Sequence, residues 1–97
     1  MEKFVRLVEQ YPMEKKPWTT ANGESKLLKS VELVFNDNIE SFTCEARDEL
    51  AEALAEQPLT KGRWFLVHAR MNVREVTPEG KPKYRMNKIT LLKVSEM

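Results

Sequence analysis

The sequence predicts a small all-β domain with one helix, and three patterns support that prediction. Most of the chain alternates hydrophobic and polar residues with period two, as strands with one buried face do. One stretch, at residues 46–57, instead repeats hydrophobic residues at helical spacing. Proline, glycine and asparagine residues separate these segments and mark turns. With 97 residues, the chain is expected to form one domain, residues 1–97, around a single core.

The first strand is expected at residues 3–11, KFVRLVEQY. Pro12 and Pro17 then lack the amide proton that a strand ladder needs. The segment around them is therefore expected to be an exposed loop, or a strand end that leads into a hairpin turn at Asn22-Gly23.

Two further strands are expected before the helix. Residues 24–35 form the second strand, a tight turn follows at 36–38, and residues 39–45 form a short third strand. The hydrophobic residues of the second strand share one parity, which predicts that they face the core: Leu27, Val31, Leu33 and Phe35.

The helix and the last two strands complete the domain. Within 46–57, most residues are strong helix formers, and Pro58 ends the helix. A fourth strand follows as far as Val76, residues 78–82 form a turn, and residues 83–94 form the fifth strand. The core of the helix and the fifth strand is expected to include Ala46, Leu50, Ala53, Leu54, Ile89 and Leu91.

The order is therefore three strands, one helix and two strands. A single helix between the third and fourth of five strands is the layout of the oligonucleotide/oligosaccharide-binding fold, or OB-fold, a closed or nearly closed barrel. We predict a five-stranded OB-fold barrel.

The two faces of the fourth strand differ in composition. One face is expected to pack into the core, with Phe65, Val67, Ala69, Met71 and Val73. The other face is richer in aromatic and basic residues than a merely solvated face would be, with Trp64, Leu66, His68, Arg70, Asn72 and Arg74. This second face is a candidate binding surface.

Composition excludes several classes of protein. Charged residues make up 32% of the chain and hydrophobic residues 41%, a globular balance rather than that of a disordered or membrane protein. No apolar run is long enough to span a membrane, and the first residues do not resemble a signal peptide, so a cytoplasmic location is expected. The single cysteine, Cys44, precludes an internal disulfide and a cysteine-rich zinc site.

Charge is segregated along the chain despite a net charge of +1. Residues 36–57 hold seven acidic residues against one basic residue, a local balance of −6. Residues 61–93 hold nine basic residues against two acidic ones, a local balance of +7. Such a distribution predicts a basic side that could meet a polyanion.

The later half of the chain carries a series of short motifs in order: Phe42, Leu50-Ala51-Glu52, Leu59-Thr60-Lys61-Gly62, Arg70 and Arg74, Glu79-Gly80 and Tyr84. With these motifs it resembles the bacterial single-stranded DNA-binding protein (SSB) family. The resemblance covers about half of the chain and implies an OB-fold, single-stranded DNA as partner and a role in DNA replication.

The chain also departs from that family. The loop between the second and third strands, which in the family holds DNA-stacking aromatic residues, shortens here to residues 36–38, and Val76 stands where a tryptophan is usual. No acidic tail follows the last strand, so the family's recruitment of replication partners is not expected. The chain is similar to a pared-down SSB core, or to the related primosomal replication protein.

Proteins bind single strands with aromatic rings on which bases stack and with a basic groove that contacts phosphates. The candidate stacking residues are Trp18, Phe42, Trp64 and Tyr84. The candidate phosphate contacts are Lys26, Lys29, Arg63, Arg70, Arg74, Lys81, Lys83, Arg85 and Lys88.

An oligomer, most simply a dimer, is expected, because the first strand and the outer faces of the second to fourth strands carry more hydrophobic residues than a monomer needs. Two alternatives stay open. Trp64, Leu66 and His68 could cover an oligomer interface or bind another protein, without nucleic acid. The polymer could be RNA rather than DNA, because stacking and phosphate contacts serve both.

Catalysis, cofactors and resident metals are not expected. His68 has no further ligands spaced for a metal site, and Cys44 lies at a strand position that predicts burial. Glu45, Asp48 and Glu49 are expected in the first helical turn, where negative charge complements the helix dipole.

Overall fold

The computed structural model describes residues 1–76, 79–80, 82 and 84–96, with the backbone alone for 74–76 and 84–87. It contains six strands and one helix. Their bounds in chain order are β1 (Glu2–Gln10), β2 (Glu14–Thr19), β3 (Ser25–Asn36), β4 (Ser41–Arg47), α1 (Asp48–Glu56), β5 (Trp64–Val76) and β6 (Tyr84–Glu96).

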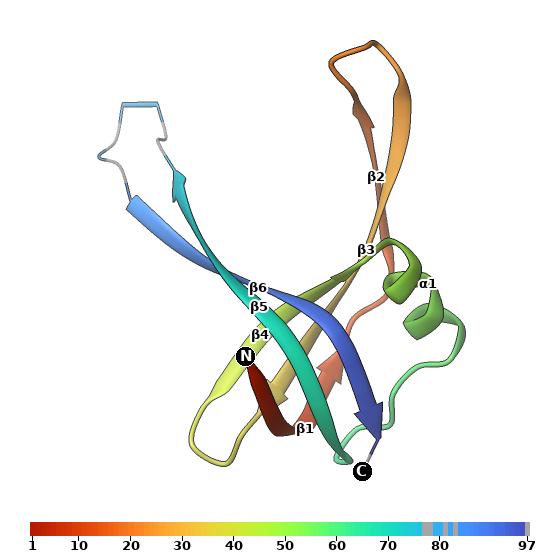
Figure 1. Ribbon diagram of the computed structural model, residues 1–97, viewed down its shortest axis with the longest axis vertical. Coiled ribbons are helices and arrows are strands. Elements are labelled where there is room, and N and C mark those ends of the chain that lie inside the picture. The colour runs from red at the N-terminus through yellow and green to blue at the C-terminus, as the bar shows by residue number, and fades with distance from the viewer. Residues whose placement is uncertain (77–78, 81, 83, 97) are drawn as a thin grey trace.

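Five of the six strands close into a ring, as Figure 1 shows. The strand order is β1-β5-β6-β4-β3, and an additional antiparallel pairing between β3 and β1 closes it. All neighbours in the ring are antiparallel except β4 and β6, which are parallel where Glu45 lies opposite Thr90. This arrangement confirms the five-stranded, OB-type barrel with one helix.

The sixth strand, β2, corrects the expected strand count. The proline-interrupted segment is a strand that pairs with β3 alone, and Pro17 lies opposite Leu27. Proline is tolerated because β2 is an edge strand: one of its two sides has no neighbouring strand in the described part of the chain, so an amide proton on that side has no ladder hydrogen bond to make. The helix therefore follows the fourth strand in chain order, not the third.

β1 is shared by two neighbours in the ring. Its first half, from Glu2 to Arg6, pairs with β5, and its second half, from Arg6 to Gln10, pairs with β3. The register shifts between Leu7 and Glu9, which marks a bulge. A bulge bends a strand, and here it lets one strand serve two sides of the ring.

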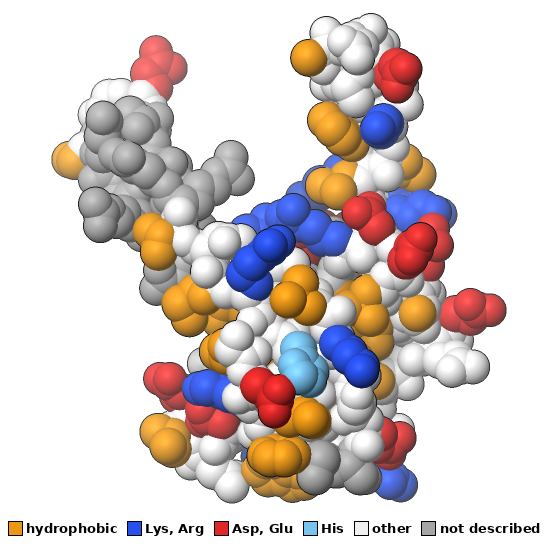
Figure 2. All heavy atoms as spheres, in the orientation of Figure 1, with side chains coloured by type: hydrophobic (Ala, Val, Ile, Leu, Met, Phe, Trp, Pro, Cys, Tyr) orange, Lys and Arg blue, Asp and Glu red, His pale blue; other side chains and the backbone are white. Residues whose placement is uncertain are grey.

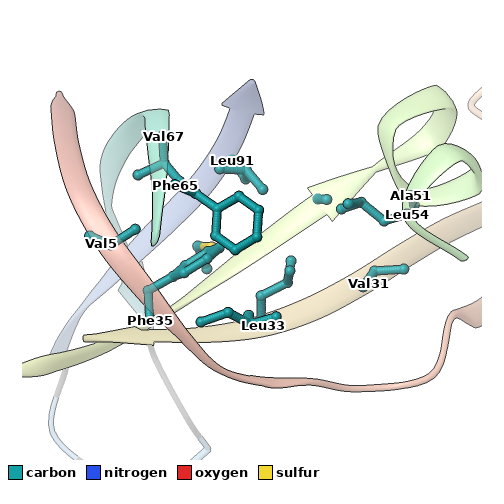
Figure 3. Close-up of a cluster of buried hydrophobic side chains, with 12 residues drawn as sticks. Val5, Val31, Leu33, Phe35, Ala51, Leu54, Phe65, Val67 and Leu91 are labelled. Carbon is teal, nitrogen blue, oxygen red and sulfur yellow. The ribbon is translucent and has the colours of Figure 1, made fainter. Parts of the chain in front are cut away.

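Alternating residues from the ring fill the core, which Figure 3 shows. Phe35 and Phe65 are the largest of the fully buried side chains. The other buried members are Val5, Leu7, Val31, Leu33, Cys44, Ala46, Ala51, Leu54, Val67 and Leu91.

Helix α1 packs against β3 and β4 and buries Ala51 and Leu54. The side chain of Gln10 joins the helix to β1: its Nε2 donates to the carbonyl of Leu54, and its Oε1 accepts from the amide of Leu59, both at 3.0 Å. The helix starts two residues later than expected, so Ala46 packs into the core from β4. Ala53, which was expected in the core, is exposed, because α1 buries the face that carries Ala51 and Leu54.

Two hairpins extend beyond the barrel from the same end (Figure 1). We call them the β2–β3 arm and the β5–β6 arm. Leu27, Met71 and Val73, which were expected in the core, are exposed because the strands run past the core into these arms.

Candidate nucleic-acid interface

The outer surface at the foot of the arms follows from strand alternation. Cys44 and Ala46 of β4 point into the core, so Glu45 and Arg47 point outward. Leu91 of β6 likewise points inward. We define the arm-side face as the outward residues of this region: Glu32, Glu45, Arg47, Arg70, Lys88 and Thr90.

The basic residues of the arm-side face come from three strands. Arg47 lies opposite Ser30, where the β2–β3 arm leaves the barrel. Arg70 lies opposite Thr90 on β6. Figure 2 shows Lys and Arg side chains gathered in the recess between the two arms. The fold thus brings together Arg47, Arg70 and Lys88, which lie between 18 and 41 residues apart in the sequence.

Glu45 lies between two of these cations. Its Oε1 is 2.5 Å from Arg47 Nε and 3.6 Å from Lys88 Nζ. Burial alone would raise the pKa of the Glu45 carboxyl, but the hydrogen bond from Arg47 and the nearby charges lower it below its ordinary value. Glu45 is therefore ionised at neutral pH and neutralises part of the positive charge beside it.

A hollow of about 390 Å³ opens beside Glu45. Residues from the β1–β2 connection, β2, β3 and β4 line it, among them Tyr11, Lys16, Ser30, Glu32 and Glu45. The backbone amide of Tyr11 donates to the carbonyl of Glu32 at 2.9 Å, which fixes the connection against β3.

The β2–β3 arm carries an exposed aromatic ring. Trp18 is 48% exposed and lies directly opposite Lys26, so the two side chains share one side of the arm. Because Lys26 has the same parity as the outward-facing Glu32, that side continues the outer surface of β3. A ring beside a cation can stack on a base while the cation contacts its phosphate.

Trp64 lies on a different surface. Three cross-strand pairs form the outer face of β1 and β5, which we call the β1–β5 face: Glu2 with His68, Phe4 with Leu66, and Arg6 with Trp64. Trp64 precedes Arg70 by six residues of strand, a separation of roughly 20 Å. Arg63 directly precedes Trp64 at the start of β5, and its Nη1 is 3.3 Å from the Oε1 of Glu96. The structure therefore does not bring Trp64 or Arg63 to the arm-side face.

Two other candidates point away from the arm-side face. Phe42 has the inward parity of β4, packs against the core and lies beside Phe35, so the structure does not bring its ring to the arm-side face. Lys29 forms an ion pair with Glu52 of α1. Their positions follow from the register of β3 and β4, which the sequence alone leaves unspecified.

Five candidates lie outside the described side chains. Arg74, Tyr84 and Arg85 are placed by their backbone in the β5–β6 arm, whereas Lys81 and Lys83 are outside the described residues. They remain predictions from the sequence.

Arg47 and the position of Glu45 on this face were not predicted from the sequence. Both were assigned to the acidic helical segment, but the structure has them in β4. One signal could have shown this: Phe42, Cys44 and Ala46 alternate with polar residues, so the period-two pattern extends to Arg47.

The environments of Cys44 and His68 do not favour catalysis. Burial raises the pKa of the Cys44 thiol to about 12, which leaves it protonated and unreactive at neutral pH. His68 Nδ1 is 3.3 Å from Glu2 Oε2 on the β1–β5 face. Asp48 and Glu49 lie in the first turn of α1, as expected, whereas Glu45 does not.

Neither a metal-binding cluster nor a membrane-spanning helix occurs among the described residues. Within residues 1–76 and the described parts that follow, no three His, Cys, Asp or Glu residues are grouped so that they could hold a metal ion. Among the same residues, no helix is long and apolar enough to cross a membrane.

Comparison with solved structures supports the fold assignment. The chain is similar to the small single-stranded DNA-binding protein from Streptomyces coelicolor, with a TM-score of 0.54 and 18% sequence identity. The match covers 100% of this chain and 92% of the other. No family model and no curated protein matches the sequence. At this identity the match shows a shared fold, in agreement with the SSB-like OB-fold expected from the sequence.

Proposed function

We propose that the protein binds single-stranded nucleic acid, DNA in the first instance, on its arm-side face and without catalysis. The observation that carries the proposal is the recess between the arms, where Lys and Arg side chains gather (Figure 2). Strand pairing and the contact of Lys88 with Glu45 place Arg47, Arg70 and Lys88 at the foot of the arms. Trp18 and Lys26 on the β2–β3 arm add a stacking platform and a further cation. The shared fold with a single-stranded DNA-binding protein supports this assignment.

Phosphate contacts and base stacking predict binding that depends little on nucleotide sequence. Lysine and arginine side chains contact phosphates whatever the sequence, and a ring stacks on any base, so strong sequence preference is not expected. The same contacts would accept RNA. We place this activity in the cytoplasm, in processes that expose single strands, such as replication.

Titration of intrinsic tryptophan fluorescence with oligo-dT at several salt concentrations tests the proposal. We expect quenching, because a base stacks on Trp18, and an affinity that falls steeply with salt. The slope of log affinity against log salt should be about −0.7 for each phosphate neutralised. Arg70→Gln should flatten the slope by about one such unit. No quenching and no retention of labelled oligonucleotide at low salt would overturn the proposal.

We also propose that the β1–β5 face mediates self-association, most simply as a dimer. Phe4 is 57% and Trp64 39% exposed, and with Leu66 they form an apolar patch where a solvated face would be polar. Sedimentation of Phe4→Ser should show loss of the dimer. Leu27→Ser is the matched control, because Leu27 is 49% exposed and lies opposite Pro17 on the β2–β3 arm, beyond the barrel. A monomeric wild-type protein at high concentration would exclude this association.

A further inference from the structure

The position of Glu45 is unusual for a surface that contacts phosphates. It lies between Arg47 and Lys88, two of the three cations of the arm-side face. It also lies directly opposite Glu32 on the neighbouring strand, and like charges in that position repel each other. Among the described residues, no Lys or Arg forms an ion pair with Glu32. The centre of the basic face therefore carries two carboxylates.

A phosphate and the Glu45 carboxylate seek the same donors. Arginine and lysine bind either anion through charge-assisted hydrogen bonds. A strand that reaches Arg47 and Lys88 must therefore displace Glu45 or share its donors, and the displaced carboxylate would lie near both the phosphates and Glu32. Part of the binding free energy is spent on this exchange.

On the basis of the proposed function, we propose that Glu45 is a built-in competitor for the phosphates of the bound strand. It occupies Arg47 and Lys88 in the free protein and keeps the affinity below what the basic residues could provide. The consequence is faster release of the strand than the same face would allow without Glu45.

Comparison of two single-charge variants separates this local effect from a change in overall charge. Glu45→Gln removes the carboxylate at the centre of the arm-side face. Glu96→Gln removes a carboxylate that pairs with Arg63 at the far end of β5, so it is matched in charge and in kind of ion pair. Both residues lie on the surface, and thermal melting checks that both variants fold.

Binding of labelled oligo-dT is then measured by fluorescence anisotropy at several salt concentrations. We expect Glu45→Gln to bind about tenfold more tightly, the equivalent of one additional charge-assisted contact. Its salt slope should be steeper by about 0.7 to 1.4, because one or two further cations become available to phosphates. Glu96→Gln should change the affinity less than about twofold. Stopped-flow dissociation should show that the gain for Glu45→Gln lies in slower release.

A double-mutant cycle with Lys88→Met provides a second measurement. If Glu45 occupies Lys88, then removing Lys88 should cost more affinity in the Glu45→Gln background than in the wild type. Equal costs in both backgrounds would contradict the inference.

Three further outcomes would each overturn the inference for a different reason. Equal gains in Glu45→Gln and Glu96→Gln would indicate an effect of net charge alone and overturn the inference while oligo-dT binding stands. Weaker binding by Glu45→Gln would indicate that Glu45 positions the cations for phosphate, which also overturns it. If neither the wild type nor Glu45→Gln binds oligo-dT at low salt, the proposed function fails, and the inference fails with it.

Discussion

Phe42 and Phe35 lie opposite each other on β4 and β3, and their ring centroids are 6.0 Å apart. The Nζ of Lys3 lies over the Phe42 ring at 5.9 Å from its centroid. The ring is thus held between the core and a lysine, so its contribution is to stability. Aromatic pairs of this kind stabilise a fold beyond the area that they bury.

Phe42→Ala should therefore lower the free energy of unfolding and leave nucleic-acid binding unchanged. We expect a loss of about 2 to 3 kcal/mol, less than for a fully buried phenylalanine, because Phe42 is only partly buried. Urea denaturation measures this loss, and anisotropy at a temperature where the variant is folded measures binding. A stable variant with weak binding would return Phe42 to the interface.

The two tryptophans should respond differently to substitution. Trp18→Ala should weaken oligo-dT binding by about 1 to 3 kcal/mol, the usual contribution of one stacked base, with little change in the salt slope. Trp64→Ala should leave the affinity of each protomer for a short oligonucleotide nearly unchanged but weaken self-association. Anisotropy with a labelled oligonucleotide and sedimentation distinguish the two effects. The reverse result would move the binding surface to the β1–β5 face.

Asp37 should make the fold sensitive to acid. The backbone amides of Glu40 and Ile39 donate hydrogen bonds to its carboxylate, and the Nζ of Lys3 is 3.2 Å from its Oδ2. Together these contacts lower the pKa of Asp37 from 3.8 to about 2. Because the folded-state pKa is depressed, this stabilisation is fully present above pH 3.8 and is lost as the pH falls to about 2. Asp37→Asn keeps an acceptor for the amides but cannot titrate.

Melting temperatures of the wild type and Asp37→Asn between pH 5 and pH 2, the window on either side of that shift, test this expectation. The wild type should be more stable at the upper end, and the difference should shrink as the pH falls. Contributions from Glu45 and Glu52, whose pKa values are also lowered, are present in both proteins and cancel. A difference that does not vary with pH would contradict the assignment.

Cys44 should react with thiol reagents only when the protein opens. Its side chain is buried in the core, and burial raises its pKa to about 12. Alkylation near pH 8 should therefore be slow in the native protein and accelerate with urea in parallel with unfolding. Fast modification in native buffer, at a rate comparable to that of a free thiol, would show that the barrel opens locally at β4.

The sequence was sufficient for the barrel because its signal is local. Val31, Leu33 and Phe35 alternate with polar residues, and so do Phe65, Val67 and Ala69, and all six are buried. Strand identity and the inner face of each strand follow from such alternation. The helix also follows, because Leu50, Ala53 and Leu54 recur at spacings of three and four residues, and a spacing of three does not fit a period of two.

The binding surface could not be predicted in the same way, because it depends on which strands are neighbours. Trp64 and Arg70 belong to one strand and share one face of it in the sequence. In the structure, however, Trp64 lies opposite Arg6 of β1, whereas Arg70 lies opposite Thr90 of β6. Strand β2 was uncertain because Pro17 argues against a central strand and is compatible only with an edge. Arg47 was missed because the boundary between β4 and α1 was set two residues too early.

The division of β1 between two neighbours also has a consequence for how the chain folds. The residues that β1 needs on one side, from Trp64 to His68, lie some 60 residues away along the chain. During synthesis, β1 and β3 can pair early, but β1 gains its second neighbour only after β5 has left the ribosome, and the ring closes only after β6, which lies between β5 and β4. Contacts of such long sequence separation carry a high loop-closure cost and slow folding. Until closure, the apolar residues Val5 and Leu7 remain without their full cover, which makes this stage the one most exposed to aggregation.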